Sequence, residues 1–92
     1  MVKFSKLNGM KVITSDSFTV GEIDGGEVVT ESWQITHLHV ALTNDITNKL
    51  GFKKPFLGNV TICIPTRIVK AIGDVVTLDQ SLNQIKELKE CS

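Results

Sequence analysis

The hydrophobic residues of this chain fall into short runs, rich in Val, Ile and Thr, which turn residues separate at intervals of roughly 8–12 positions. Runs of this kind are typical of β-strands, because β-branched side chains fit a pleated and half-buried surface. The pattern therefore predicts an all-β domain of six short strands, at residues 11–14, 18–24, 28–42, 60–64, 68–72 and 75–78.

Turn chemistry separates these strands at three places. Asp16-Ser17 and Asp24-Gly25-Gly26 favour tight turns, and Gly73-Asp74 is a two-residue hairpin signal. Gly21 interrupts the second strand, which is typical of a bulge or of a point where another backbone approaches closely.

The longest strand candidate, residues 28–42, changes its alternation along its length. Trp33 and Ile35 lie in one phase, whereas Leu38, Val40 and Leu42 lie in the other. A bulge near residues 36–37, in a strand that bends around a closed sheet, produces such a slip. A strand buried on both faces is the simpler alternative. A single tryptophan on a strand is usually buried or half-buried, and that placement is expected for Trp33.

Short helices are expected at three positions. Residues 4–9 read as one helical turn that Gly9 closes, and a helix over 45–50 begins at Thr43 or Asn44 and ends at Gly51. The sequence Ser81-Leu82-Asn83-Gln84 matches a capping box, which opens a C-terminal helix over about residues 82–90.

Length and composition indicate one domain, residues 1–92, with an ordinary globular balance of 41% hydrophobic and 22% charged residues. The chain has no apolar stretch long enough to span a membrane, and residues 1–9 lack the apolar core of a secretory signal. A cytoplasmic protein is expected. In that compartment Cys63 and Cys91 are expected to be reduced, with Cys63 as a buried core thiol.

Charge is segregated along the chain, although the formal net charge is zero. Residues 12–48 contain acids and no Lys or Arg, whereas residues 49–72 contain Lys and Arg and no acid. These regions either pair within the molecule or present a two-signed surface to a partner. Zero net charge argues against a general binder of polyanions.

Motifs that carry chemistry are missing from the sequence, which has no phosphate-binding glycine loop, no metal-binding cysteine pair and no nucleophile elbow. His37 and His39 are spaced so that both point to one face of a strand, as two metal ligands could, but the sequence signals no third ligand. They are expected on the outer face of the sheet. No catalytic residue, cofactor or metal is predicted.

The segment 51–58 is the most basic and most apolar loop in the chain. Phe52, Lys53, Lys54, Phe56 and Leu57 are its candidate partner-binding residues. They suit either an apolar hook for a protein or a basic and aromatic contact for single-stranded RNA. The structural alternative is that Phe52 packs beside the helix cap at Gly51 and that Phe56 fills one end of a barrel.

Three segments, which together span residues 4–78, form a recognisable series. They are Phe4-x-x-Leu7-x-Gly9-x-x-Val12 with Asp16 and Val20-Gly21-Glu22-Ile23-Asp24; Ile35-x-x-Leu38-x-Val40; and Ile64-Pro65-x-x-x-Val69-x-x-Ile72-Gly73-Asp74-Val75-Val76-x-Leu78. In this order the segments resemble a PRC-barrel domain of the short, stand-alone archaeal type. Ser17 departs from the family pattern, which usually has Gly in the first turn.

The resemblance implies a small six-stranded β barrel over about residues 4–78, with no catalytic residue to transfer. For the stand-alone archaeal type it implies a non-enzymatic adaptor in cell division, which contacts a SepF-type membrane anchor of the division ring. The alternative is an RNA- or ribosome-associated module, because the family also includes a domain of a ribosome-maturation factor. Another protein is the expected partner, and a homodimer is compatible with the segregated charge.

Overall fold

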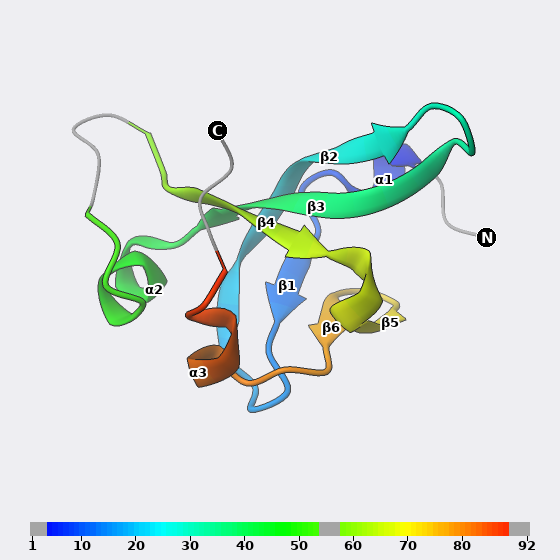
Figure 1. Cartoon of the computed structure of the whole chain (residues 1–92). Helices are drawn as coiled ribbons and strands as arrows, with labels where there is room; N and C mark the ends of the chain where they lie inside the picture. The colour runs from blue at the N-terminus through cyan, green and yellow to red at the C-terminus, as the bar shows by residue number, and fades with distance from the viewer. Residues whose placement is uncertain (1–3, 54–57, 89–92) are drawn as a thin grey trace.

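The computed structural model describes residues 4–53 and 58–88, and these form six strands and a few short helical segments (Figure 1). All six strands belong to one sheet, in the order β4-β3-β2-β1-β6-β5. Neighbouring strands run antiparallel except β1 and β6, which are parallel. The elements are α1 (Phe4–Leu7), β1 (Lys11–Ile13), β2 (Thr19–Val29), β3 (Gln34–Leu42), α2 (Asn44–Lys49), β4 (Thr61–Pro65), the 3₁₀ turn η1 (Thr66–Ile68), β5 (Val69–Ile72), β6 (Val76–Leu78) and α3 (Leu82–Ile85).

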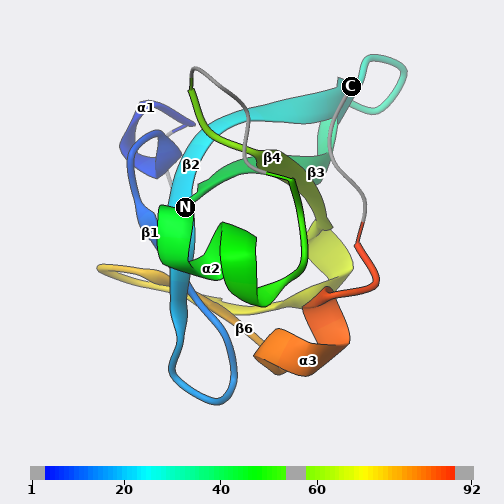
Figure 2. The same cartoon turned by 90° about the vertical axis from the view of Figure 1, so that its left-hand side faces the viewer.

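The sheet curls around its apolar face, and α2 lies across one end of the curl (Figure 2). Within the described residues no ladder joins the edge strands β4 and β5, so the sheet is open. The mostly-β prediction is therefore confirmed, whereas the closed barrel is not seen. The chain passes from one edge strand to the other through η1. No helix among the described residues is long and apolar enough to cross a membrane.

The core fills the inside of the curl. On β3 and β4 alternate residues are buried, so that each strand turns one face inward. Ile85 of α3 and Ile46 of α2 complete the core from two helices. The buried hydrophobic residues are Leu7, Met10, Val12, Val20, Ile23, Leu38, Val40, Leu42, Ile46, Leu50, Val60, Ile62, Ile64, Ile68, Val76, Leu78 and Ile85.

Gly21 lies in the middle of the sheet, paired with Val12 on one side and with Leu42 on the other. The register between β1 and β2 shifts beside it, which leaves Val20 as an extra residue. A side chain at Gly21 would collide with the backbone carbonyl of Ala41. Both features predicted for this glycine, a bulge and a close backbone approach, are confirmed.

The β2–β3 hairpin differs from the prediction. Gly25 and Gly26 do not form a turn, because β2 continues through them as far as Val29. A register shift between Ile23 and Gly25 accommodates the glycines within the strand. The chain reverses instead at residues 30–33, which the sequence pattern placed inside a strand.

The bulge expected near residues 36–37 is confirmed. Glu27 pairs with His37 and Val28 pairs with Ile35, so Thr36 is the extra residue on β3. Beyond this bulge Leu38, Val40 and Leu42 point into the core. The change of alternation therefore marks a real change of register, and not a strand buried on both faces.

The helix α3 is short and depends on its caps. Ser81 and Gln84 form the predicted capping box, with bonds between each side chain and the other residue's backbone N–H. Asp16, from the β1–β2 turn, accepts a further bond at 3.1 Å from the backbone N–H of Leu82. The hydroxyl of Thr14 donates to the same carboxylate at 2.6 Å, and this bond is the main cause that lowers the pKa of Asp16. The helix predicted for residues 82–90 ends at Ile85, and residues 89 and 90 lie outside the described residues.

Ser17 has a φ of 71°, in the left-handed region that favours glycine. We expect Ser17→Gly to raise the free energy of unfolding by about 1 kcal/mol or slightly less, because relief of the roughly 1–2 kcal/mol steric cost of positive φ exceeds the cost of the added freedom of the unfolded chain. Urea denaturation of the two proteins measures the difference. The matched control is Ser15→Gly in the same turn, which is expected to lose roughly 0.4–1 kcal/mol through the added freedom of the unfolded chain. If Ser17→Gly loses stability as Ser15→Gly does, strain at Ser17 is not the reason.

Candidate functional site

Two of the five predicted partner-binding residues lie in the described part of the chain. Phe52 is half-buried and packs against the core, and Lys53 is exposed. Lys54, Phe56 and Leu57 lie outside the described residues, so their predicted role stays a prediction.

The backbone around Phe52 shows why this residue turns toward the core. Gly51 has a φ of 80° and ends α2, as the sequence predicted. Its N–H donates to the carbonyl of Asn48, and the N–H of Phe52 donates to the carbonyl of Thr47, both at 3.1 Å. These two bonds form a Schellman motif, in which the residue after the glycine makes an apolar contact with the helix. Phe52 therefore has a structural function at this helix end.

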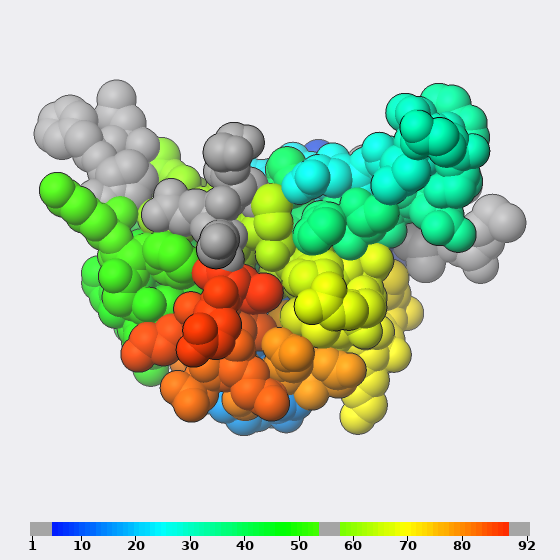
Figure 3. All heavy atoms as spheres, viewed as in Figure 1, coloured from blue at the N-terminus to red at the C-terminus, as the bar shows by residue number. Residues whose placement is uncertain are grey.

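Among the described residues, three of the five large exposed apolar side chains, including the most exposed one, lie at the tip of the β2–β3 hairpin, whereas Phe18 and Ile72 lie elsewhere. Trp33 is 77% exposed, and Val28 and Val29 are 41% and 40% exposed. The tip stands out from the body of the molecule (Figure 3). The expectation that Trp33 is buried or half-buried is wrong, because this residue belongs to the turn and not to the strand. Its φ of 56° is in the left-handed region, which is uncommon for a bulky side chain.

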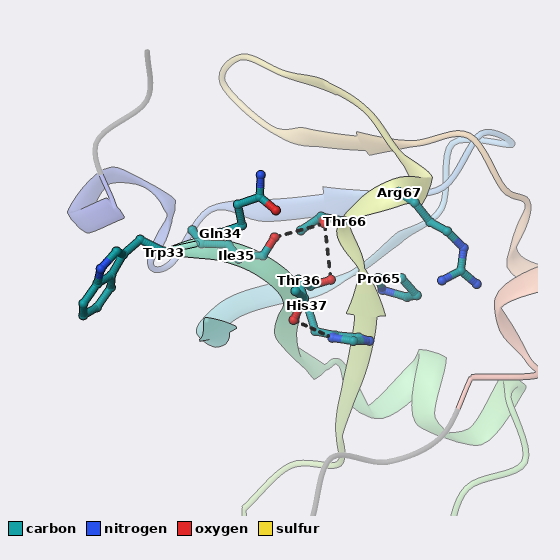
Figure 4. A pocket seen from close by; sticks show the side chains of 8 residues that line it. All are labelled: Trp33, Gln34, Ile35, Thr36, His37, Pro65, Thr66 and Arg67. Carbon is teal, nitrogen blue, oxygen red and sulfur yellow. Dashed lines mark hydrogen bonds between the residues drawn. The ribbon is translucent and has the colours of Figure 1, made fainter. Parts of the chain in front are cut away.

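A hollow of about 680 Å³ begins at Trp33 and extends along the start of β3 toward η1. In the close view the indole ring points away from the hollow at one end, and Arg67 marks the other end (Figure 4). The lining residues are Trp33, Gln34, Ile35, Thr36, His37, Pro65, Thr66 and Arg67.

The floor of this hollow is fixed by the bulge on β3. The hydroxyl of Thr66 lies 3.1 Å from the carbonyl oxygen of Ile35 and 3.2 Å from that of Thr36, and it donates to this pair. Thr66 therefore joins the start of η1 to the backbone of β3 at the bulge. The shape of the hollow is therefore tied to the backbone of two segments that are distant in sequence.

The hollow offers contact surface and few groups for catalysis. His37 is its one imidazole, and Nδ1 lies 3.0 Å from the hydroxyl of the adjacent Thr36. Arg67 is exposed and supplies a positive charge at the rim. The lining contains no carboxylate and no cysteine. An apolar or aromatic group with a nearby anion suits these surroundings.

The acidic and basic regions of the sequence pair only weakly within the molecule. Among the described residues one ion pair joins them, between Asp45 and Lys49 at 3.9 Å within α2. Lys49 also lies 5.1 Å from the centre of the Phe18 ring. Most of the segregated charge therefore remains on the surface, where a partner can meet it.

The two histidines on β3 have different neighbours. His37 lines the hollow, whereas Nε2 of His39 lies 3.1 Å from Oε2 of Glu27 on β2. Cys63 on β4 lies beside the same carboxylate, with Sγ 3.2 Å from Oε2. Cys63 is half-buried on the outer face between the inward Ile62 and Ile64, so the predicted core thiol is wrong in its placement.

The redox state of Cys63 also differs from the prediction. This residue is disulfide-bonded, where the sequence led us to expect a reduced thiol. Alternation along β4 explains why it is accessible for bonding, because Cys63 points away from the core that its two isoleucine neighbours enter. Cys91, the other cysteine of the chain, lies outside the described residues.

The sequence pattern did not indicate the hairpin tip, because Gly25 and Gly26 predicted a turn at residues 24–26, whereas the chain reverses at residues 30–33. Thr30-Glu31-Ser32-Trp33 carries no strong turn signal.

No protein-family model matches this chain, and no similar sequence was found among curated proteins.

Proposed function

We propose that this protein is a non-enzymatic binding module that contacts another protein through the tip of the β2–β3 hairpin. The observation that carries the proposal is the exposure of Trp33, which is 77% accessible on a projecting turn. Tryptophan is the residue type most enriched among the anchors that dominate binding energy in protein interfaces. Leaving its large apolar surface in water is unfavourable, and a partner that covers it removes that cost.

The surroundings of Trp33 fit an interface. Val28 and Val29 extend the apolar surface on β2, and the hollow behind the tip is wide enough for a partner's side chain. Arg67, at the opposite end of the hollow from Trp33, adds an exposed positive charge to the same surface.

The PRC-barrel resemblance supports a more specific version of this proposal. A curled sheet of six strands is compatible with the small barrel that the resemblance implies. The β5–β6 hairpin is present, but its turn has three residues, 73–75, and not the two that the sequence indicated, because Ile72 pairs with Val76. On this proposal the chain is a cytoplasmic adaptor in archaeal cell division, and its partner is a SepF-type membrane anchor. The two edge strands, and the charges in the described part of the chain that form no ion pair, are also compatible with a homodimer. Light scattering tests this.

A specific observation favours the RNA-associated alternative as well. Trp33, Arg67 and Lys70 are exposed, and aromatic and cationic side chains together are the surface that binds single-stranded RNA. The acidic residues of the same hairpin, Glu27 and Glu31, and the zero net charge favour a protein partner.

The test is affinity capture from the source cells with the wild-type chain and with Trp33→Ala. We expect the variant to lose a specific protein partner, since loss of a central aromatic anchor costs about 2–4 kcal/mol of binding free energy. Mass spectrometry identifies the captured proteins, and titration with the purified partner measures the loss. Nuclease treatment of the lysate separates the two functions, because a partner held only through RNA disappears.

The matched control is Phe18→Ala, which removes an exposed aromatic side chain from a different part of the surface. If Phe18→Ala reduces capture of the partner as much as Trp33→Ala does, the interface is not specific to the hairpin tip. Unchanged thermal unfolding of both variants shows that neither effect comes from the fold.

A further inference from the structure

Three side chains with metal-binding atoms lie together on the outer face of the sheet. They are Glu27 on β2, His39 on β3 and Cys63 on β4, and their ligand atoms all lie within 4.8 Å of one another. Because β2, β3 and β4 are successive strands of the sheet, the ladder between them fixes the three backbones (Figure 1). This cluster is separate from the hollow behind Trp33, whose lining includes none of the three.

The register of the sheet explains how the cluster forms. His39 pairs with Cys63 on one side and with Gly25 on the other. Gly25 has no side chain to stand beside the imidazole, and a β-carbon there would lie 3.6 Å from Nδ1 of His39. The carboxylate of Glu27 reaches diagonally across the strands to His39 and Cys63.

The distances are close to those of a tetrahedral zinc site. Bonds of about 2.0–2.3 Å at tetrahedral angles place neighbouring ligand atoms roughly 3.3–3.6 Å apart. The carboxylate oxygen of Glu27 lies 3.1 Å from Nε2 of His39 and 3.2 Å from Sγ of Cys63. Small rotations of half-exposed side chains bring these separations to the required values, since 29% of the His39 side chain and 50% of the Glu27 side chain are accessible. Imidazole, thiolate and carboxylate are the donors that zinc accepts.

The oxidation state of Cys63 determines whether this cluster can bind a metal ion. In the structure this residue is disulfide-bonded, and a disulfide sulfur is not the thiolate that metals require. A dithiol reductant supplies two electrons and two protons to the disulfide, which becomes two thiols while the reductant is oxidised to its own disulfide. The thiol at Cys63 then loses its proton as the Zn–S bond forms.

We propose that reduction of the disulfide at Cys63 creates a zinc site of Glu27, His39 and Cys63, with water in the fourth position. The oxidised protein holds the disulfide and does not bind the metal, so the cluster reports the redox state of its surroundings. This site goes beyond the proposed partner-binding function and does not depend on it.

The test is equilibrium dialysis of the full chain against zinc, with metal analysis, in the presence and absence of a non-thiol reductant. We expect one zinc per reduced chain and none for the oxidised chain. Substituting cobalt is expected to give the thiolate-to-metal absorption of a tetrahedral site in the reduced protein alone. Absence of zinc binding by the reduced wild-type chain would overturn the proposal.

Four variants assign the ligands. Glu27→Gln, His39→Ala and Cys63→Ser are each expected to weaken zinc binding by more than about 100-fold, because loss of a direct ligand exceeds the loss of an outer hydrogen bond. His37→Ala is the matched control, since it removes the other histidine of the same strand face and is expected to bind as the wild type does. Equal losses in His37→Ala and His39→Ala would contradict the site.

Cys91→Ser tests whether the disulfide alone prevents zinc binding, because it leaves the three proposed ligands in place. This substitution removes the only other cysteine of the chain, so an intramolecular disulfide cannot form. The monomer, separated by size exclusion from any disulfide-linked dimer, then has a thiol at Cys63. We expect the variant to bind zinc without reductant. Failure to bind under both conditions would overturn the three-ligand site. Thermal unfolding of each metal-free variant shows whether it is folded before it is scored.

Discussion

Gly21→Ala is expected to destabilise the protein by more than about 4 kcal/mol, which is a large part of the total stability of a small domain. A β-carbon at this position would meet the carbonyl oxygen of Ala41, and it would lie 2.8 Å from the carbonyl carbon of the same residue and 3.0 Å from Cα of Leu42. These are backbone atoms in the centre of the sheet, so no side chain can move aside to make room. The ladder between β2 and β3 has to separate at this point instead.

Urea denaturation followed by circular dichroism measures this effect, with Gly25→Ala as the matched control on the same strand. A β-carbon at Gly25 would lie 3.6 Å or more from its nearest neighbours, which belong to the His39 side chain. That is an ordinary contact, so we expect Gly25→Ala to change the free energy of unfolding by less than about 1 kcal/mol. Similar stabilities for the two variants would show that the close approach at Gly21 is not a constraint on the sheet.

Ile85→Ala is expected to lower the free energy of unfolding by about 2–5 kcal/mol, as truncation of a fully buried isoleucine does. Ile85 is 0% exposed and belongs to the core, although its helix α3 has only four residues. A helix of this length has no stability of its own, so the packing of Ile85 and the caps at its start hold it in place.

The same residue tests whether α3 belongs to the cooperative unit of the sheet. We expect one unfolding transition for Ile85→Ala, shifted to lower urea concentration. Asn83→Ala is the matched control, since it changes an exposed position of the same helix and is expected to stay within about 0.5 kcal/mol of the wild type. A separate early transition, or a loss no larger than that of Asn83→Ala, would show that α3 is not part of the core.

The local elements follow closely from the sequence. The caps of α2 at Thr43 and Gly51 and the capping box of α3 are each where the pattern placed them. The bulge at Thr36 followed from the change of alternation along β3, because a shift of one residue moves apolar side chains to the other face. These features depend on a few neighbouring residues, which is why the sequence alone indicates them.

The candidate sites depended on pairings that the sequence pattern did not contain. Gly25 and Gly26 suit both a turn and a strand with a bulge, and the ladder with β3 decided for the strand. That decision moved the turn to residues 30–33 and exposed Trp33. The sequence also favoured residues 52–57 as a partner-binding loop. In the structure Phe52 of this loop packs against the core, because the cap at the end of α2 turns its side chain inward.

The sequence by itself determined a single mostly-β chain, the positions of most strands and caps, and the special requirement for glycine at position 21. The tertiary structure alone decided that the sheet is open at β4 and β5, and that Glu27, His39 and Cys63 meet. The physical reason is the range of the interactions. Caps and alternation act over a few residues, whereas Glu27 and Cys63 are 36 positions apart and meet only through the cross-strand register.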